Sequence, residues 1–205
     1  MSDPPSIYPA TQTPTPILFF RHSPVASQGV CYGQSRQETT HDAETVANLF
    51  MERYQSHQAD DSDPSVKRFV SRPHCVWSSP APRCELPAKL ISQRLGSARR
   101  TDPRLYELHF GTWEGLTWDE IERRDSVTFH HWMDQWQSAA PPQGESVADL
   151  QRRVRQWSME LDPALAHILI GHAGVFRALY VSAQLKSWDE AMSTSVPHLT
   201  LISFP

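Results

Sequence analysis

Arginine and histidine side chains stand at or shortly after the ends of three short apolar segments of this sequence. They are Arg21 and His22 after residues 17–20, Arg83 beyond residues 75–77, and His172 after residues 167–170. If the three segments are parallel strands, their carboxyl ends meet in the crevice where α/β proteins bind ligands. Guanidinium groups supply forked N–H donors that match phosphate oxygens. Two arginines and two histidines in one crevice therefore indicate a site for a dianionic, tetrahedral group.

The hydrophobic pattern predicts the elements that would bring these residues together. The three segments are short and have turn-like neighbours, which is typical of buried strands, and residues 199–204 are expected to form a last strand. Helical spacing of apolar residues predicts helices at 40–54, after Pro80, at 114–124, at 146–161 and from about Val175. This order predicts an α/β fold, a three-layer sandwich with a mostly parallel central sheet and helices on both faces.

Some details of these helices are also predicted. Ser146 is expected to cap its helix, with Asp149 three residues on. Pro87 removes a backbone donor from the helix after Pro80 unless it lies in the first turn. That helix is expected to bury Leu86, Leu90, Ile91 and Leu95. Residues 129–143 are aromatic and rich in histidine, and their pattern predicts no element.

Composition limits the class of protein. The 205 residues fit one domain, and a hydrophobic content of 39% is enough for a core. A net charge of −4 argues against a nucleic-acid partner, and the apolar runs are too short for a membrane span. Residues 1–16 are polar and punctuated by proline, so we expect an extended or disordered leader before one domain at 17–205. Three cysteines without a CxxC motif favour a reducing cytoplasm.

Six segments, in order along the chain, resemble the motifs of the histidine phosphatase superfamily, which has the phosphoglycerate mutase-like fold. They are ILFFRH at 17–22, YGQ at 32–34, WSSPAPRC at 77–84, LYELHFGTWEG at 105–115, GESVADLQRRV at 144–154 and ILIGHAGVFR at 168–177. Each motif alone is weak, but six in the right order are specific. The Cys-Tyr-Gly and Arg-Cys details are most similar to the α-ribazole phosphatase-like branch.

The resemblance implies a role for each matched residue. His22 would be the nucleophile and form a phosphohistidine, which divides hydrolysis into two easier steps. Arg21, Arg83 and His172 would bind the non-bridging oxygens, and Glu107 would transfer the proton. The further residues expected to bind phosphate or substrate are Ser23, Tyr32, Gly33, Gln34 and Ala173. The family implies no metal and no other cofactor, because its phosphoryl transfer rests on positioning and electrostatics.

The sequence departs from the family pattern at several positions. Ser23 and Ala173 stand where glycine is more common, and Arg36 and Gln37 stand where aspartate is common. A side chain at position 23 could crowd the phosphate, or its hydroxyl could donate to it. Glu114 is the alternative to Glu107 as the proton-transferring carboxylate. His130 and His131 do not predict a metal site, because adjacent histidines point apart on a helix.

Three functions are compatible with these residues. The leading one is a cytoplasmic phosphomonoester hydrolase for a small phosphorylated metabolite, with α-ribazole phosphate as the substrate that the branch implies. A phosphoglycerate-type mutase would need a closed site that keeps water from the phosphohistidine. A non-catalytic phospholigand-binding protein has Ser23 as its sequence support. Specificity is expected to lie in residues 34–39 and 129–143, and both a monomer and a homodimer remain open.

Overall fold

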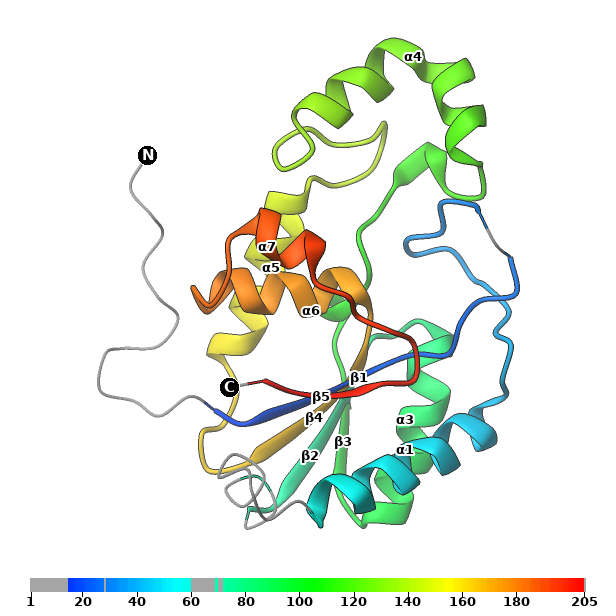
Figure 1. Cartoon of the computed structure of the whole chain (residues 1–205). Coiled ribbons are helices and arrows are strands. Elements are labelled where there is room, and N and C mark those ends of the chain that lie inside the picture. Colours follow the sequence, from blue (N-terminus) through cyan, green and yellow to red (C-terminus); the bar gives the residue numbers. More distant parts are fainter. Residues whose placement is uncertain (1–14, 28, 60–68, 70–71, 205) are drawn as a thin grey trace.

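A five-stranded sheet forms the centre of the computed structural model, which describes residues 15–27, 29–59, 69 and 72–204 (Figure 1). The strands are β1 (Ile17–Arg21), β2 (His74–Ser78), β3 (Ala98–Thr101), β4 (Ala166–Gly171) and β5 (Leu201–Phe204). Their order across the sheet is β3-β2-β4-β1-β5. All neighbours are parallel except β5, which pairs antiparallel with β1. The mostly parallel sheet is therefore confirmed.

Helices cover both faces of this sheet. They are α1 (Ala43–Gln58) and α3 (Pro82–Leu95) on one face, and α5 (Val147–Met159) and α6 (Ala173–Ser182) on the other (Figure 1). Because side chains alternate along a strand, β1 contributes to both cores. Ile17 and Phe19 pack with α5 and α6, whereas Leu18 and Phe20 pack with α1 and α3. Strands buried on both faces explain the continuous apolar runs in the sequence.

The helix starts follow capping rules. Ser146 caps α5 and forms a capping box with Asp149, as predicted. Asp42 caps α1 through the backbone N–H of Thr45. These caps fix where each helix begins, because they satisfy donors that have no partner within the helix.

The predicted buried face of α3 is wrong at one position. Leu86 is 55% exposed, and the face toward the sheet is formed by Cys84, Ala88 and Ile91. Those three residues are spaced by four and three positions, so they share a side of the helix that Leu86 does not. Pro87 lies inside the helix and is buried.

Several elements of the structure were not predicted from the sequence pattern. The edge strand β3 has four exposed residues, ARRT, and thus no apolar run. A short 3₁₀ turn, η1 (Pro103–Leu105), follows it. The expected helix at 114–124 instead begins at Trp118, after a second turn, η2 (Gly111–Trp113), and α4 (Trp118–Asp134) continues into the segment without a predicted structure. A short helix, α7 (Trp188–Ser193), precedes β5.

Helix α4 lies away from the sheet, at the top of Figure 1, and is sharply bent. Asp125 has a non-helical backbone (φ −127°, ψ 38°), and its carboxylate accepts a hydrogen bond of 3.0 Å from the indole of Trp113. In a straight helix Trp118 and Trp132 would be about 21 Å apart. Their rings instead stack with centroids 6.0 Å apart, so the bend brings both arms of α4 together.

The predicted leader falls outside the described residues except for positions 15 and 16. The division into a leader and one domain at 17–205 thus stays a prediction. Within the part of the chain that the structure describes, no helix combines the length and apolar character that crossing a membrane requires.

Candidate active site

His22 lies directly after β1 and is almost fully buried. Its Nδ1 is 2.6 Å from the carbonyl oxygen of Ser23. Because a carbonyl oxygen can only accept, Nδ1 carries the proton, and Nε2 of the neutral ring keeps its lone pair. The backbone therefore fixes the tautomer that a nucleophilic histidine needs.

Two further histidines flank this ring. His172, at the end of β4 and the start of α6, has its ring centroid 5.0 Å from that of His22. His198 lies 5.1 Å away, and its Nδ1 is 2.8 Å from the His22 carbonyl oxygen. The sequence predicted His172 but not His198, which belongs to no motif. Strand pairing of β1 with β4 explains how residues 150 positions apart meet.

Burial keeps both central rings neutral. Burial, followed by the charge of Arg83, lowers the pKa of His22 well below its usual value of 6.5. Burial, followed by His22 itself, does the same to the pKa of His172. Near pH 7 His22 is therefore free of a second proton, and His172 has one N–H to donate.

The two predicted arginines border this cluster. Arg83 is 5% exposed, and its Nη1 and Nη2 donate to the carbonyl oxygens of Ser35 (3.0 Å) and Gly33 (2.6 Å). Arg21 donates through Nη1 to the carbonyl oxygen of Val196. The Nε atoms of both arginines are buried without a hydrogen-bond partner among the described residues. Since buried donors are nearly always satisfied, these guanidinium groups have hydrogen-bonding capacity left for an anion.

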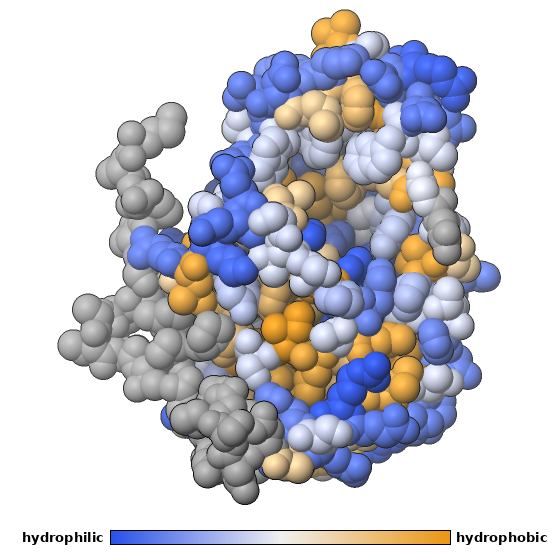
Figure 2. All heavy atoms as spheres, viewed as in Figure 1, coloured by the Kyte–Doolittle hydropathy of each residue, from blue (hydrophilic) through white to orange (hydrophobic). Residues whose placement is uncertain are grey.

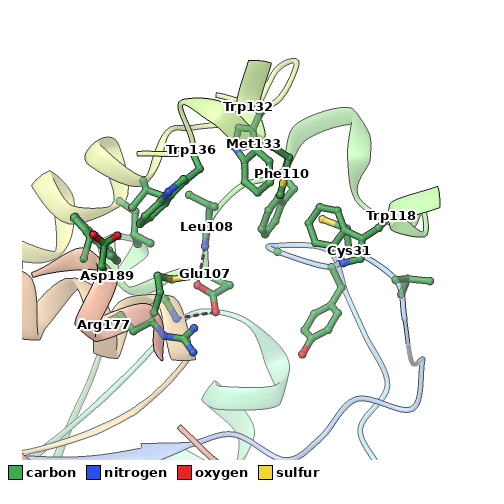
Figure 3. Close-up of a pocket in the computed structure, with 18 residues that line it drawn as sticks. Cys31, Glu107, Leu108, Phe110, Trp118, Trp132, Met133, Trp136, Arg177 and Asp189 are labelled. Carbon is green, nitrogen blue, oxygen red and sulfur yellow. Dashed lines mark hydrogen bonds between the residues drawn. The ribbon is translucent and has the colours of Figure 1, made fainter. Parts of the chain in front are cut away.

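Glu107 is held by two backbone N–H groups, one of which lies at the start of α6. Its carboxylate accepts from the N–H of Leu108 (3.0 Å) and the N–H of Gly174 (3.2 Å), the two bonds dashed in Figure 3. A Cβ atom at position 174 would lie 2.1 Å from Glu107 Oε1. Glycine at 174 is thus required for the carboxylate to approach the positive end of the helix.

The alternative carboxylate, Glu114, has a different environment. It accepts from the backbone N–H groups of Gln34 (2.9 Å), Ser35 and Phe110 (3.2 Å). Glu107 lines the cavity between α4 and α7, which we call the main cavity because it adjoins this site, whereas Glu114 does not. Glu114 therefore holds the 33–35 loop, and proton transfer by Glu107 stays a prediction.

The predicted substrate-side residues lie around the same centre. Tyr32 faces the Arg83 guanidinium at 5.6 Å, and Gln34 Nε2 donates to the Glu107 carbonyl oxygen at 3.0 Å. Gly33 has no room for a side chain, because a Cβ atom there would lie 2.0 Å from the Leu108 carbonyl oxygen. Ala173 is buried as the first residue of α6.

The Ser23 hydroxyl has hydrogen-bonding partners within the protein. Ser23 Oγ lies 3.3 Å from Thr40 Oγ1 and 3.2 Å from His41 Nδ1. The side chain is completely buried. Both contacts connect the end of β1 to the residues that precede α1.

A cavity of about 580 Å³ lies between Glu107 and helices α4 and α7 (Figure 3). Figure 2 shows this side of the molecule hollowed below α4, with hydrophobic side chains inside the hollow. Trp132, Met133 and Trp136 line it, and the expectation that residues 129–143 determine specificity stays a prediction. Residues 36–39 instead line a second cavity of about 330 Å³, together with Ser23 and Arg83.

The sequence did not reveal that Arg177 and α7 also border the main cavity. Arg177 ends the last of the six motifs, which was its only sequence signal. Within the described ranges, no three histidine, cysteine, aspartate or glutamate side chains are grouped so that they could hold a metal ion. The expectation of a metal-independent site stays a prediction.

Known phosphatases are similar in sequence to parts of this chain. The adenosylcobalamin/α-ribazole phosphatase of Salmonella typhimurium is 27% identical over 107 residues, which are 51% of this chain and 53% of that protein. The glucosyl-3-phosphoglycerate phosphatase of Mycobacterium tuberculosis is 30% identical over 121 residues, 53% of each chain. A bifunctional protein of the same species is 41% identical over 81 residues, 40% of this chain and 22% of its own length. The chain thus spans about half or less of these curated relatives.

Solved structures share the fold over nearly the whole chain. The α-ribazole phosphatase from Shigella flexneri has a TM-score of 0.73 at 20% identity, covering 92% of this chain and 89% of that one. A mycobacterial glucosyl-3-phosphoglycerate phosphatase with inorganic phosphate has a TM-score of 0.71 at 23% identity, covering 92% and 88%. A model of the histidine phosphatase superfamily (branch 1) matches residues 17–204, so this chain belongs to that superfamily.

Proposed function

We propose that this chain is a metal-independent phosphomonoester hydrolase that acts on a small phosphorylated metabolite through a phosphohistidine at His22. The observation that carries the proposal is the contact between His22 Nδ1 and the Ser23 carbonyl oxygen. It leaves Nε2 as a neutral nucleophile beside buried His172. Membership of the superfamily and the phosphatases among the relatives support the same activity.

The reaction has two steps. In the first, His22 Nε2 attacks phosphorus, the bond from phosphorus to the leaving oxygen breaks, and the carboxyl group of Glu107 gives that oxygen its proton. In the second, the Glu107 carboxylate takes a proton from water, whose oxygen attacks phosphorus and displaces Nε2. Arg21, Arg83 and neutral His172 donate to the non-bridging oxygens in both steps.

Within this activity, α-ribazole phosphate is the substrate that the sequence details favour. A relative named for α-ribazole supports it, but a relative named for glucosyl-3-phosphoglycerate has comparable identity. Hydrolysis of both phosphoesters at matched concentrations discriminates between the two. Ser23, which favoured a non-catalytic protein, is accounted for by its contacts with Thr40 and His41.

Substitution of His22 tests the activity. We expect His22→Ala to lower kcat/KM for p-nitrophenyl phosphate by about 10³-fold or more, because no other group can take the phosphoryl unit. His130→Ala, at an exposed position on α4, is the matched control and should retain full activity. Equal turnover by His22→Ala and the unmodified protein would refute the mechanism. Isomerisation of 3-phosphoglycerate with a bisphosphate primer would instead indicate a mutase.

A further inference from the structure

The main cavity begins at the residue that would protonate the leaving group. Glu107 and Gly174 line it together with several aromatic side chains (Figure 3). A leaving oxygen that takes a proton from Glu107 must be within hydrogen-bond distance of that carboxyl group. The organic part of the substrate attached to that oxygen therefore extends into this cavity.

Two groups of aromatic rings line the cavity. Phe110, Trp118 and Trp132 form one group, with Trp118 stacked on Trp132 at 6.0 Å and in edge contact with Phe110 at 6.1 Å. Trp136 and Trp188 form the other, in edge contact at 5.9 Å. The bend at Asp125 is what brings the first group together. Trp118 nevertheless stays 41% exposed, so much of this large apolar ring is not covered by the protein.

Polar partners for a ligand are few in this cavity. Apart from Glu107, its charged lining side chains in the described residues are Arg177 and Asp189. The Arg177 guanidinium already donates to the carbonyl oxygens of Ala191 (3.0 Å) and Thr194 (3.4 Å) at the end of α7. Sugar hydroxyls or a carboxylate placed between the rings would lose water and meet few further partners, chiefly the Tyr32 hydroxyl and the Trp132 indole N–H, which is buried without a partner in the described residues.

We infer that the substrate's alcohol carries a planar, largely apolar ring system, and that the two groups of aromatic rings, which contain Trp118 and Trp136, bind this ring system. The inference rests on the proposed phosphatase activity and names its substrate class. A cavity of about 580 Å³ has the size of sites that enclose a whole small molecule. Offset stacking on indole rings supplies affinity that a small polar alcohol cannot gain.

Two esters with the same kind of leaving oxygen test the inference. They are 2-(1-naphthyl)ethyl phosphate and ethyl phosphate, both esters of primary alcohols, so a difference in kcat/KM reports on binding of the ring. We expect the naphthyl ester to be preferred by about a hundredfold. Trp118→Ala and Trp136→Ala should each reduce that preference about tenfold, because kcat/KM falls more for the naphthyl ester than for ethyl phosphate. Trp118→Phe should restore most of it.

Trp77→Phe is the matched control. Trp77 lies in β2, where its indole donates to His167, and it does not line the cavity. This variant should retain the unmodified preference. Equal kcat/KM for the two esters, or equal losses for both in the Trp118 variant, would overturn the inference and leave the phosphatase proposal standing.

Failure of the proposed function has a different signature. Turnover of neither ester would overturn the phosphatase activity, and turnover that persists in His22→Ala would overturn its phosphohistidine mechanism. Titration with 2-(1-naphthyl)ethanol then decides on the ring site independently of catalysis. Saturable quenching of tryptophan fluorescence that disappears in Trp118→Ala supports the site, and its absence in the unmodified protein overturns it.

Discussion

At the scale of single residues, the site depends on two glutamates that differ in their neighbours. Glu107 is fixed by two N–H groups and borders the cavity, whereas Glu114 accepts three N–H groups from the surrounding loops. The first arrangement places a carboxyl group where a leaving oxygen can reach it. The second completes the hydrogen bonds of loop backbone that would otherwise lack partners.

Substitution of each glutamate should separate these roles. We expect Glu107→Gln to lower kcat/KM for ethyl phosphate by about 10²–10⁴-fold, because an alkoxide leaves poorly without a proton. The loss of kcat/KM, which reports the step that releases the alcohol and not the later attack by water, should be much smaller for p-nitrophenyl phosphate, whose phenolate leaves unaided. Glu114→Gln should instead lower the free energy of unfolding by about 1–3 kcal/mol, measured by urea denaturation. A leaving-group dependence in Glu114→Gln but not in Glu107→Gln would reverse the assignment.

At the scale of elements, α5 holds the segment that carries Glu107. Arg153, on α5, donates to the carbonyl oxygens of Arg104 (2.6 Å), Tyr106 (2.7 Å) and Glu107 (3.0 Å). It also pairs with Glu145 at 2.6 Å, and Glu145 accepts from the N–H of His109. Through these bonds one helix fixes both sides of Glu107, which makes Arg153 a positioning residue.

Arg153→Lys tests this positioning. A lysine cannot reproduce the fork of donors, so we expect kcat for ethyl phosphate to fall about tenfold with little change in KM. Combined with Glu107→Gln, the substitution should cause little further loss, since it acts through that carboxyl group. Arg152→Lys is the matched control, because the exposed Arg152 pairs only with Asp149 in the described contacts. Additive losses in the double variant would contradict the role.

The sequence predicted the elements that are apolar and the site residues that follow them. Buried β1 and β4 have continuous hydrophobic runs, and His22 and His172 come at their ends. It missed β3, whose four residues are exposed, and the bend of α4, which depends on a hydrogen bond between Trp113 and Asp125. Contacts of this kind, like the one between His198 and His22, leave no periodic pattern.

At the scale of the whole molecule, burial of histidines links stability to pH. Burial is the largest cause of a lowered pKa for five histidines of the described residues. They are His22, His74, His167, His172 and His198. Each takes up a proton near pH 6.5 when the chain is unfolded but resists it when folded. Below that pH the unfolded chain therefore binds more protons, and the folded state loses stability.

We expect the free energy of unfolding to be nearly constant between pH 7 and 8 and to fall as the pH drops from 6.5 to 5.5. Each histidine that titrates only in the unfolded chain contributes a slope of up to about 1.4 kcal/mol per pH unit. Urea denaturation at pH 7.5 and 5.5 measures the difference, and His172→Gln should reduce it. Stability that rises on acidification would contradict the prediction.

The thiol of Cys84, which packs against His172, can report on opening of the pocket. Cys84 Sγ lies 3.6 Å from His172 Nε2, and burial raises the pKa of this thiol to about 12. The thiolate is the nucleophile that attacks iodoacetamide, so the buried, protonated Cys84 reacts only in molecules whose crevice has transiently opened. The rate of Cys84 carbamidomethylation, followed by mass spectrometry, therefore measures how often the pocket opens. A tightly bound phosphate analogue should slow this reaction.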